Sequence, residues 1–249
     1  VTPSLVLGSA VHEVLESLST VPTNTRFDDS LVLKLDRLWE NFSGKRGGFK
    51  DLDEEHQYKE RGKAMLRRVM DHPGPLSNLA VKIKESLPYF WLSDDENIIL
   101  CGKIDWLEYL KDEDSIHIID FKTGKKEETE LSLQLPIYHL LVAKCQKRPV
   151  AKASYWYLDF SDLPKEKALP DILAAEASLL EIGRKIKLAR KLDKFDCPNG
   201  NGGCLYCRQL EAVVRGEGEK GGEMGHRDSY VLEKEILQEE EDTADSFII

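Results

Sequence analysis

IHIIDFKTG, residues 116–124, is the stretch from which the fold of this chain can be worked out. Its first half is a run of β-favouring apolar residues, and its second half carries an aspartate and a lysine two positions apart. Successive side chains of a strand point to opposite faces, so Asp120 and Lys122 share the face of Ile116 and Ile118, which is expected to pack in the core. A strand that turns a carboxylate and an ammonium group toward its apolar side indicates a polar site at the end of the strand.

A hairpin is expected to bring a second carboxylate to the same place. KDED, residues 111–114, suits the turn, and with Leu110 opposite Ser115 the residue Asp105 falls opposite Asp120. Facing like charges destabilise a sheet, and an unpaired charge on a half-buried face costs more. Either the nearby lysine or a divalent cation would balance the pair, and hard cations prefer carboxylate oxygens. Two ordinary acids at exposed strand ends are the alternative.

The rest of the chain alternates between helical and strand patterns in an order that defines the fold class. Helices are expected over residues 7–19, 29–43, 54–72, 131–145 and 170–192, and strands over 89–93, 97–110, 115–123 and 150–160. This order predicts an α/β fold in which a mixed central sheet, containing an antiparallel meander, is flanked by helices. A helical insert is expected at about residues 20–86.

The negative charge of the chain is concentrated at its C-terminal end. The formal net charge is −10, of which residues 211–249 carry −8 through twelve acidic and four basic residues. We expect this acidic tail to be largely disordered, because its composition offers little apolar surface to bury. Inside the body, residues 183–194 form a basic helical segment that either faces phosphates or is an ordinary solvated surface.

The compartment is predicted from what the sequence lacks and from its cysteines. It has no run of eighteen apolar residues and no signal peptide, so neither a membrane span nor secretion is expected. Three of the five cysteines lie close together near the C-terminus, which favours metal binding in a reducing compartment over disulfides. We therefore expect a cytoplasmic protein, and the absence of an initial methionine suggests a fragment of a longer one.

Four short motifs follow one another along the chain. They are G-x-x-x-H at residues 8–12, G-x-x-D at 102–105, D-x-K at 120–122 and Q-x-x-x-Y at 134–138. Each motif alone is weak, but in this order they resemble the PD-(D/E)XK nuclease superfamily. IIDFKTGK is similar to the wording of its RecB-like branch, which includes nuclease domains of helicase–nucleases and CRISPR-associated exonucleases. The resemblance covers residues 1–210 apart from the helical insert, and it implies a restriction-endonuclease-like core.

The resemblance also implies roles for the motif residues. His12, Asp105 and Asp120 would hold Mg²⁺ or Mn²⁺, with the backbone carbonyl of Phe121 as a further ligand. Asp105, Asp120 and Lys122 would be the catalytic residues. Lys122 would orient the attacking water or stabilise the developing negative charge, while the cation lowers the pKa of that water.

For several other residues near the predicted site, two interpretations remain open. Gln134 and Tyr138 share a helix face, and the resemblance places them near the site in contact with DNA or the lysine, whereas ordinary core hydrogen bonds are the alternative. Glu16, one turn after His12, either supports that histidine or is a solvated charge, and the second interpretation is slightly favoured. The aromatic residues 155–157 either contact single-stranded DNA or belong to the core.

A cysteine knuckle follows the last predicted helix. CPNGNGGCLYC contains Cys197, Cys204 and Cys207, and C-x-x-C is a metal-binding spacing. A [4Fe–4S] cluster or Zn²⁺ usually takes four ligands. Iron–sulfur members of the branch take their first cysteine from upstream of the first motif, so we expect the fourth ligand to lie outside this chain. The spacing departs from the usual one of the branch, which leaves the cluster type open, and three thiols without a metal are the alternative.

The function implied by the resemblance is a metal-dependent deoxyribonuclease. We expect an exonuclease that hydrolyses phosphodiester bonds in single-stranded DNA or at duplex ends, in DNA repair or recombination, with a helicase domain or subunit as partner. A catalytically silent DNA-binding or scaffold module with the same fold is the main alternative. A small-molecule metallohydrolase built on the same residues is a third interpretation.

Overall fold

The computed structural model describes residues 1–84, 87–129, 132–197, 199–200, 203–224 and 227–232. Its α-helices are, in chain order, α1 (Pro3–Ser17), α2 (Leu31–Trp39), α3 (Leu52–Asp71), α4 (Gln134–Cys145), α5 (Ile172–Leu192) and α6 (Leu205–Val214). The short 3₁₀ helices are η1 (Leu18–Thr20), η2 (Thr23–Thr25), η3 (Gly44–Gly47) and η4 (Gly74–Ser77). The strands are β1 (Tyr89–Ser93), β2 (Ile98–Cys101), β3 (Trp106–Leu110), β4 (Ser115–Lys122), β5 (Val150–Tyr157), β6 (Lys165–Lys167), β7 (Glu219–Met224) and β8 (Arg227–Val231).

Polar side chains fix the starts of several helices. Thr2, Ser30, Asp51 and Asp171 each accept a hydrogen bond from the backbone N–H three residues later, at the first turns of α1, α2, α3 and α5. Such caps satisfy backbone donors that the helix itself leaves unpaired. The helices predicted from periodicity are present, and their observed boundaries differ from the predicted ones by a few residues.

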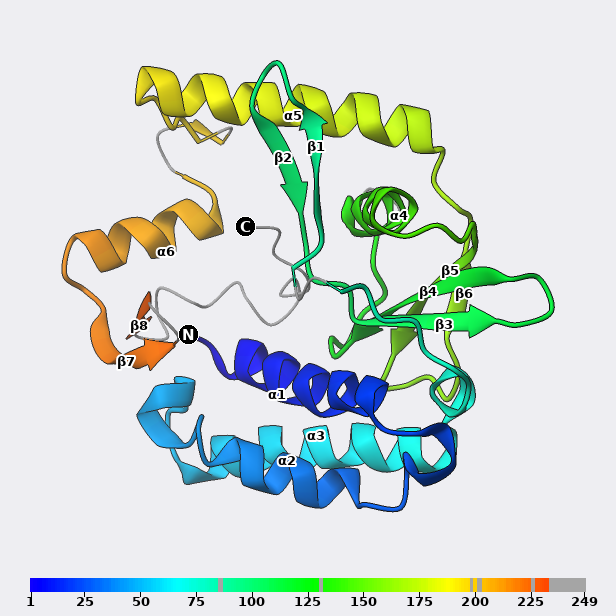
Figure 1. Ribbon diagram of the computed structural model, residues 1–249. Coiled ribbons are helices and arrows are strands. Elements are labelled where there is room, and N and C mark those ends of the chain that lie inside the picture. The colour runs from blue at the N-terminus through cyan, green and yellow to red at the C-terminus, as the bar shows by residue number, and fades with distance from the viewer. Residues whose placement is uncertain (85–86, 130–131, 198, 201–202, 225–226, 233–249) are drawn as a thin grey trace.

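The central sheet has the strand order β3-β4-β5-β6. β4 runs antiparallel to β3 and parallel to β5, so the sheet is mixed. All eight residues of β4 are buried, because the strand has a neighbour on each side and helices over both faces (Figure 1). The predicted mixed α/β fold is confirmed, and it is that of a restriction-endonuclease-like core.

Two apolar cores occupy the two faces of the sheet. On one face, α1, α2 and α3 pack against Ile119 and Phe121 of β4. On the other face, α4, α5 and the β1–β2 hairpin pack against Ile116 and Ile118. Figure 1 shows this layering, with α1 between the sheet and the two insert helices. Asp120 shares the face of Ile116 and Ile118, so the polar end of β4 points toward α4.

The predicted hairpin register is confirmed within the paired strands. Leu110 lies opposite Ser115, and Trp106 lies opposite Ile119. Asp105 lies just before β3, outside the ladder, and its carboxylate accepts a hydrogen bond from the backbone N–H of Phe121, the residue after Asp120. The four-residue turn therefore fixes which carboxylates can meet at the far end of the pair.

The predicted three-stranded meander is wrong. Residues 97–110 form two strands, and β1 and β2 make a separate two-stranded sheet. The chain leaves strand geometry between Gly102 and Asp105. A Cβ atom on Gly102 would lie 3.0 Å from Leu141 Cδ1 of α4, so the break passes close against that helix. Because the residues on both sides of the break are apolar, periodicity alone did not predict it.

The helical insert is present and is tied to the sheet. Arg61 of α3 donates hydrogen bonds to the Thr123 carbonyl at 2.7 Å and to both carboxylate oxygens of Asp159 at 3.0 and 3.1 Å. These contacts join the insert to the ends of β4 and β5. No helix among the described residues is long and apolar enough to cross a membrane.

The expectation of a largely disordered tail from residue 211 is wrong for its first part. Residue 211 lies inside α6, and the β7–β8 hairpin follows it. Lys45 of η3 contacts Glu219 of β7 at 2.8 Å, which links this hairpin to the insert. The glycine-rich composition of this segment favoured the prediction of disorder. The antiparallel β7–β8 pair nevertheless accommodates glycines. Residues 233–249 lie outside the described part of the chain.

Candidate active site

α1 carries the histidine of the first motif. His12 is half-buried, and its ring meets Phe121 edge-on with centroids 6.0 Å apart. His12 Nδ1 lies 3.3 Å from Asp105 Oδ1. One turn earlier, a Cβ atom on Gly8 would lie 3.4 Å from Thr123 Oγ1, so α1 passes close to the end of β4. The first motif therefore reaches the polar end of that strand.

Asp105 is fixed by both neighbouring elements. Its Oδ2 accepts a hydrogen bond from the Phe121 backbone N–H at 2.8 Å, while Oδ1 faces His12. Burial works against the charge of Asp105, but the His12 side chain outweighs it and holds the pKa of the carboxyl below its ordinary value. Burial alone would lower the pKa of His12, and the Asp105 carboxylate reverses this and raises it. The two groups stabilise each other as an ion pair, and a cation held by both would take the place of the imidazole proton.

Asp120, Lys122 and Gln134 form a compact buried group. Gln134 Nε2 donates to Asp120 Oδ1 at 2.7 Å, and Lys122 Nζ donates to Gln134 Oε1. Lys122 Nζ also lies 3.0 Å from Asp120 Oδ2 and 5.2 Å from the ring centre of Tyr155. Gln134 Nε2 donates to the Tyr138 hydroxyl at 3.1 Å. The D-x-K and Q-x-x-x-Y motifs are thus brought into contact at the end of β4.

The donor set fits a divalent cation. Asp120 is fully buried, and its Oδ2 accepts no hydrogen bond from the described residues, although Lys122 Nζ is near. Burial, and then the charge of Asp105, raise the pKa of Asp120 well above its ordinary range. Carboxylate oxygens and an imidazole nitrogen are normal ligands of such ions. A cation between these groups would remove the penalty that burial imposes on Asp120.

Glu16 is a site residue that the sequence analysis underrated. Nitrogen and oxygen atoms of His12, Glu16 and Asp105 lie within 4.8 Å of one another, which is close enough for one metal ion. Lys103 forms an ion pair with Glu16, and burial raises the pKa of Glu16 while this lysine opposes the rise. The slightly favoured interpretation of Glu16 as a solvated charge is therefore wrong, because the side chain is only 18 % exposed.

Glu128 was not identified from the sequence at all. Its Oε1 lies 3.4 Å from Lys122 Nζ, and its backbone N–H donates to the Tyr157 hydroxyl at 3.0 Å. The residue sits between β4 and α4, in a segment without periodic pattern. Only its closeness in sequence to the D-x-K motif could have drawn attention to it.

The residues considered for contact with single-stranded DNA differ in position. Tyr155, Trp156 and Tyr157 are at most 3 % exposed, so the aromatic run of β5 belongs to the core and not to a binding surface. The basic segment of α5 is largely exposed. Two of its cations contact Glu96: Arg184 with the carboxylate, and Lys187 with the backbone carbonyl.

The cysteine knuckle lies where α6 begins, with Cys204 at the N-cap and Cys207 in the first turn of that helix. The sulfur atoms of Cys197, Cys204 and Cys207 lie within 4.8 Å of one another. The Cys204 backbone N–H donates to Cys197 Sγ at 3.0 Å, and a hydrogen bond from the Cys207 backbone lowers the pKa of Cys204. Among the described residues this group has three members, one fewer than a closed zinc or iron–sulfur site takes.

Comparison with known protein families identifies the superfamily of this chain. Residues 1–211 match the family model of the PD-(D/E)XK nuclease superfamily. No curated protein matches the chain. The matched range contains all four motifs and every residue of the candidate site, while assignment to the RecB-like branch stays a prediction. The chain belongs to the PD-(D/E)XK nuclease superfamily.

Proposed function

We propose that this nuclease-superfamily chain is a Mg²⁺- or Mn²⁺-dependent deoxyribonuclease of the RecB-like branch, cutting phosphodiester bonds as an exonuclease. The observation that carries the proposal is the buried group of Asp105, Asp120 and Lys122, with His12 beside it. Burying two carboxylates within one site is costly unless a cation balances them. The intact D-x-K motif of residues 120–122 favours an active nuclease over a silent module.

Each side chain has a task in this proposal. His12, Asp105 and Asp120 hold the cation, with the Phe121 carbonyl as a further ligand. A cation held there would supply charge neutralisation at the phosphate and lower the pKa of the attacking water. Lys122 directs its ammonium group toward the phosphate oxygen that gains negative charge.

Gln134 and Tyr138 serve as positioning residues. Gln134 contacts both Asp120 and Lys122, so a single side chain sets the distance between the carboxylate and the ammonium group. Tyr138 accepts the second hydrogen bond of the same amide. In this proposal Gln134 and Tyr138 hold the catalytic groups in position, and more exposed residues contact the DNA.

A digestion assay tests the proposal. Purified chain is incubated with end-labelled single-stranded and duplex DNA, and with circular DNA, in Mg²⁺, Mn²⁺ or EDTA. We expect metal-dependent loss of linear DNA, and loss of about 10³-fold or more in rate for Lys122→Ala and Asp105→Asn, comparable to the removal of a central electrostatic group. Sparing of the circles would identify an exonuclease.

Matched controls keep the assay decisive. Lys111→Ala and Asp112→Asn, in the exposed turn after β3, change the same residue types away from the site and should cut normally. If wild-type protein that binds Mn²⁺ leaves all DNA intact, the silent-module interpretation replaces this one. Cleavage of a small phosphodiester without competition by DNA would favour a metallohydrolase of small molecules.

Two further features belong to the proposal. Cys197, Cys204 and Cys207 would hold Zn²⁺ or an iron–sulfur cluster with a fourth ligand from outside this chain, and a helicase domain or subunit in the cytoplasm would deliver DNA. Metal analysis of protein purified without oxygen would give about one zinc, or about four irons, per chain. The test requires protein that includes the segment supplying the fourth ligand, and such protein found metal-free with three reactive thiols would contradict the cysteine assignment.

A further inference from the structure

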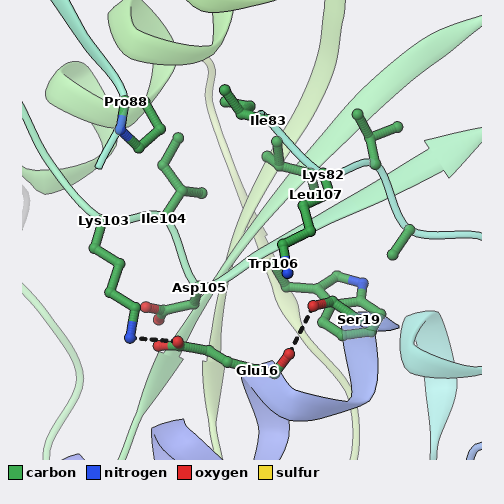
Figure 2. A pocket seen from close by; sticks show the side chains of 12 residues that line it. Glu16, Ser19, Lys82, Ile83, Pro88, Lys103, Ile104, Asp105, Trp106 and Leu107 are labelled. Carbon is green, nitrogen blue, oxygen red and sulfur yellow. Dashed lines mark hydrogen bonds and ion pairs between the residues drawn. The ribbon is translucent and has the colours of Figure 1, made fainter. Parts of the chain in front are cut away.

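A cavity of about 200 Å³ lies directly beside the candidate metal site. Glu16 and Asp105 form part of its wall, so the cavity and the proposed cation site share two residues. Its other walls come from residues 80–83 and from the chain that runs from Lys103 into β3. Figure 2 shows Lys103, Glu16 and Asp105 meeting at one end of this space.

Besides the carboxylates of Glu16 and Asp105, the lining of the cavity combines an apolar surface with two lysines. Ile83, Pro88 and Ile104 offer apolar contacts, and Lys82 and Lys103 add positive charge. Figure 2 places Ile83 and Lys82 on the wall across from Glu16. An apolar slot with cations at its rim matches a nucleotide, whose base is flat and largely apolar and whose phosphate is an anion.

Lys103 can exchange its ion-pair partner Glu16 for another anion. Its side chain is 62 % exposed, whereas that of its ion-pair partner Glu16 is 18 % exposed. An exposed lysine in an ion pair is held weakly, because water screens the attraction. The ammonium group can therefore leave Glu16 for a phosphate at small cost, and Glu16 is then available to a cation.

We propose that this cavity receives one unpaired base of single-stranded DNA, with Lys103 holding the phosphate next to the bond that is cut. The proposal rests on the proposed function and names the form of its substrate. A cavity of this size takes a single base but not a base pair, so duplex DNA would have to be unpaired before it could enter.

Equilibrium binding in EDTA tests the subsite without any cleavage. Fluorescence anisotropy of a labelled single-stranded oligonucleotide is measured for wild type, Lys103→Ala and Lys82→Ala, with Lys111→Ala as control. We expect Lys103→Ala to weaken binding about tenfold, as loss of one charged hydrogen bond does. The slope of affinity against salt should fall by about 0.7 for the lost phosphate contact, while Lys111→Ala changes neither quantity.

Two further variants separate the base contact and the exchange of partners. Ile83→Trp fills the cavity and should weaken single-strand binding while leaving the melting temperature and duplex binding nearly unchanged. Glu16→Gln frees Lys103 and should tighten binding in EDTA. Most of this gain should disappear when Lys103→Ala is added, because the freed ammonium group causes it.

The outcomes distinguish this subsite from the nuclease proposal. Equal effects of Lys103→Ala and Lys111→Ala on single-strand binding, or equal sensitivity of duplex binding to Ile83→Trp, would overturn the subsite. Cleavage is measured separately in Mg²⁺. Inactive protein that shows the predicted binding pattern would overturn the nuclease and keep the subsite, and active protein without the pattern would do the reverse.

Discussion

At the scale of single residues, the candidate site is a set of buried charges that hold one another in place. Lys122 contacts Asp120, Glu128 and Gln134, and Asp105 is fixed by a backbone amide and by His12. Side chains restrained by several partners keep one geometry, which lowers the cost of organising the site during a reaction. The geometry of the site therefore depends on neighbours as much as on the charged groups themselves.

Substitution of Gln134 tests this dependence. Gln134→Ala removes the contacts to both Asp120 and Lys122, so we expect DNA cleavage or Mn²⁺ affinity to fall by about 10- to 100-fold. Tyr138→Phe removes only the acceptor of one hydrogen bond and should cost about fivefold or less. The comparison requires cleavage rates, calorimetric titration with Mn²⁺ and melting temperatures for both variants. A Tyr138→Phe defect as large as that of Gln134→Ala would show that the glutamine does not position the site.

At the scale of elements, local sequence determines how β3 and β4 pair, and distant packing determines where β3 begins. The turn of residues 111–114 was enough to predict the register that leads to Asp105 and Asp120. The break before β3 was not predictable, because Gly102 owes its position to Leu141 of α4. Glu16 was underrated for a similar reason, since its partner Lys103 is far away in sequence.

The β3–β4 pair also contains a buried polar group that the sequence analysis did not mark. His117 Nδ1 lies 2.7 Å from Glu108 Oε2, and His117 Nε2 lies 2.7 Å from Ser154 Oγ. Asn78 Nδ2 donates to Glu108 Oε1 at 2.6 Å. Burial works against the charge of Glu108, but the hydrogen bonds from His117 and Asn78 outweigh it and hold its pKa below the ordinary value of 4.5.

This lowered pKa predicts a dependence of stability on pH. Because the folded state favours the ionised form of Glu108, its contribution is fully present above about pH 4.5 and is lost as the pH falls through the folded pKa. Glu108→Gln should lower the free energy of unfolding by about 1–3 kcal/mol at pH 7. The difference from wild type should shrink below pH 4.5.

Denaturant unfolding between pH 3 and 7 measures this difference. Asp112→Asn, in the exposed turn of the same hairpin, is the matched control and should follow the wild-type curve at every pH. A Glu108→Gln difference that is constant or grows toward acid would contradict the assignment. Either result leaves the candidate active site untouched, because Glu108 and His117 lie on the face of the sheet opposite to that of Asp120 and Lys122.

At the scale of the whole molecule, the helical insert supports the active-site helix. The apolar face of α1 is buried between the sheet and the insert, and Leu66 of α3 is fully buried in the same core. The individual helices were predictable from their apolar periodicity. Their arrangement around α1 was not, because it depends on contacts between segments that periodicity does not pair.

Leu66→Ala should therefore weaken the molecule as a whole. We expect the free energy of unfolding to fall by about 2–5 kcal/mol, as for other large-to-small changes in a packed core. Leu52→Ala on the same helix is the control, since Leu52 is 81 % exposed and its loss should cost about 0.5 kcal/mol or less. Urea unfolding curves provide both values. Equal effects of the two substitutions would mean that the insert does not pack on α1 as described.

The location of the bound cation is the most direct test of the central claim. Crystals soaked in Mn²⁺ would be measured with X-rays at the manganese absorption edge, where anomalous scattering marks the ion itself. The account predicts a strong peak within coordination distance of His12, Asp105 and Asp120, lost in Asp120→Asn. A well-ordered site without a peak, or manganese bound only elsewhere, would contradict it.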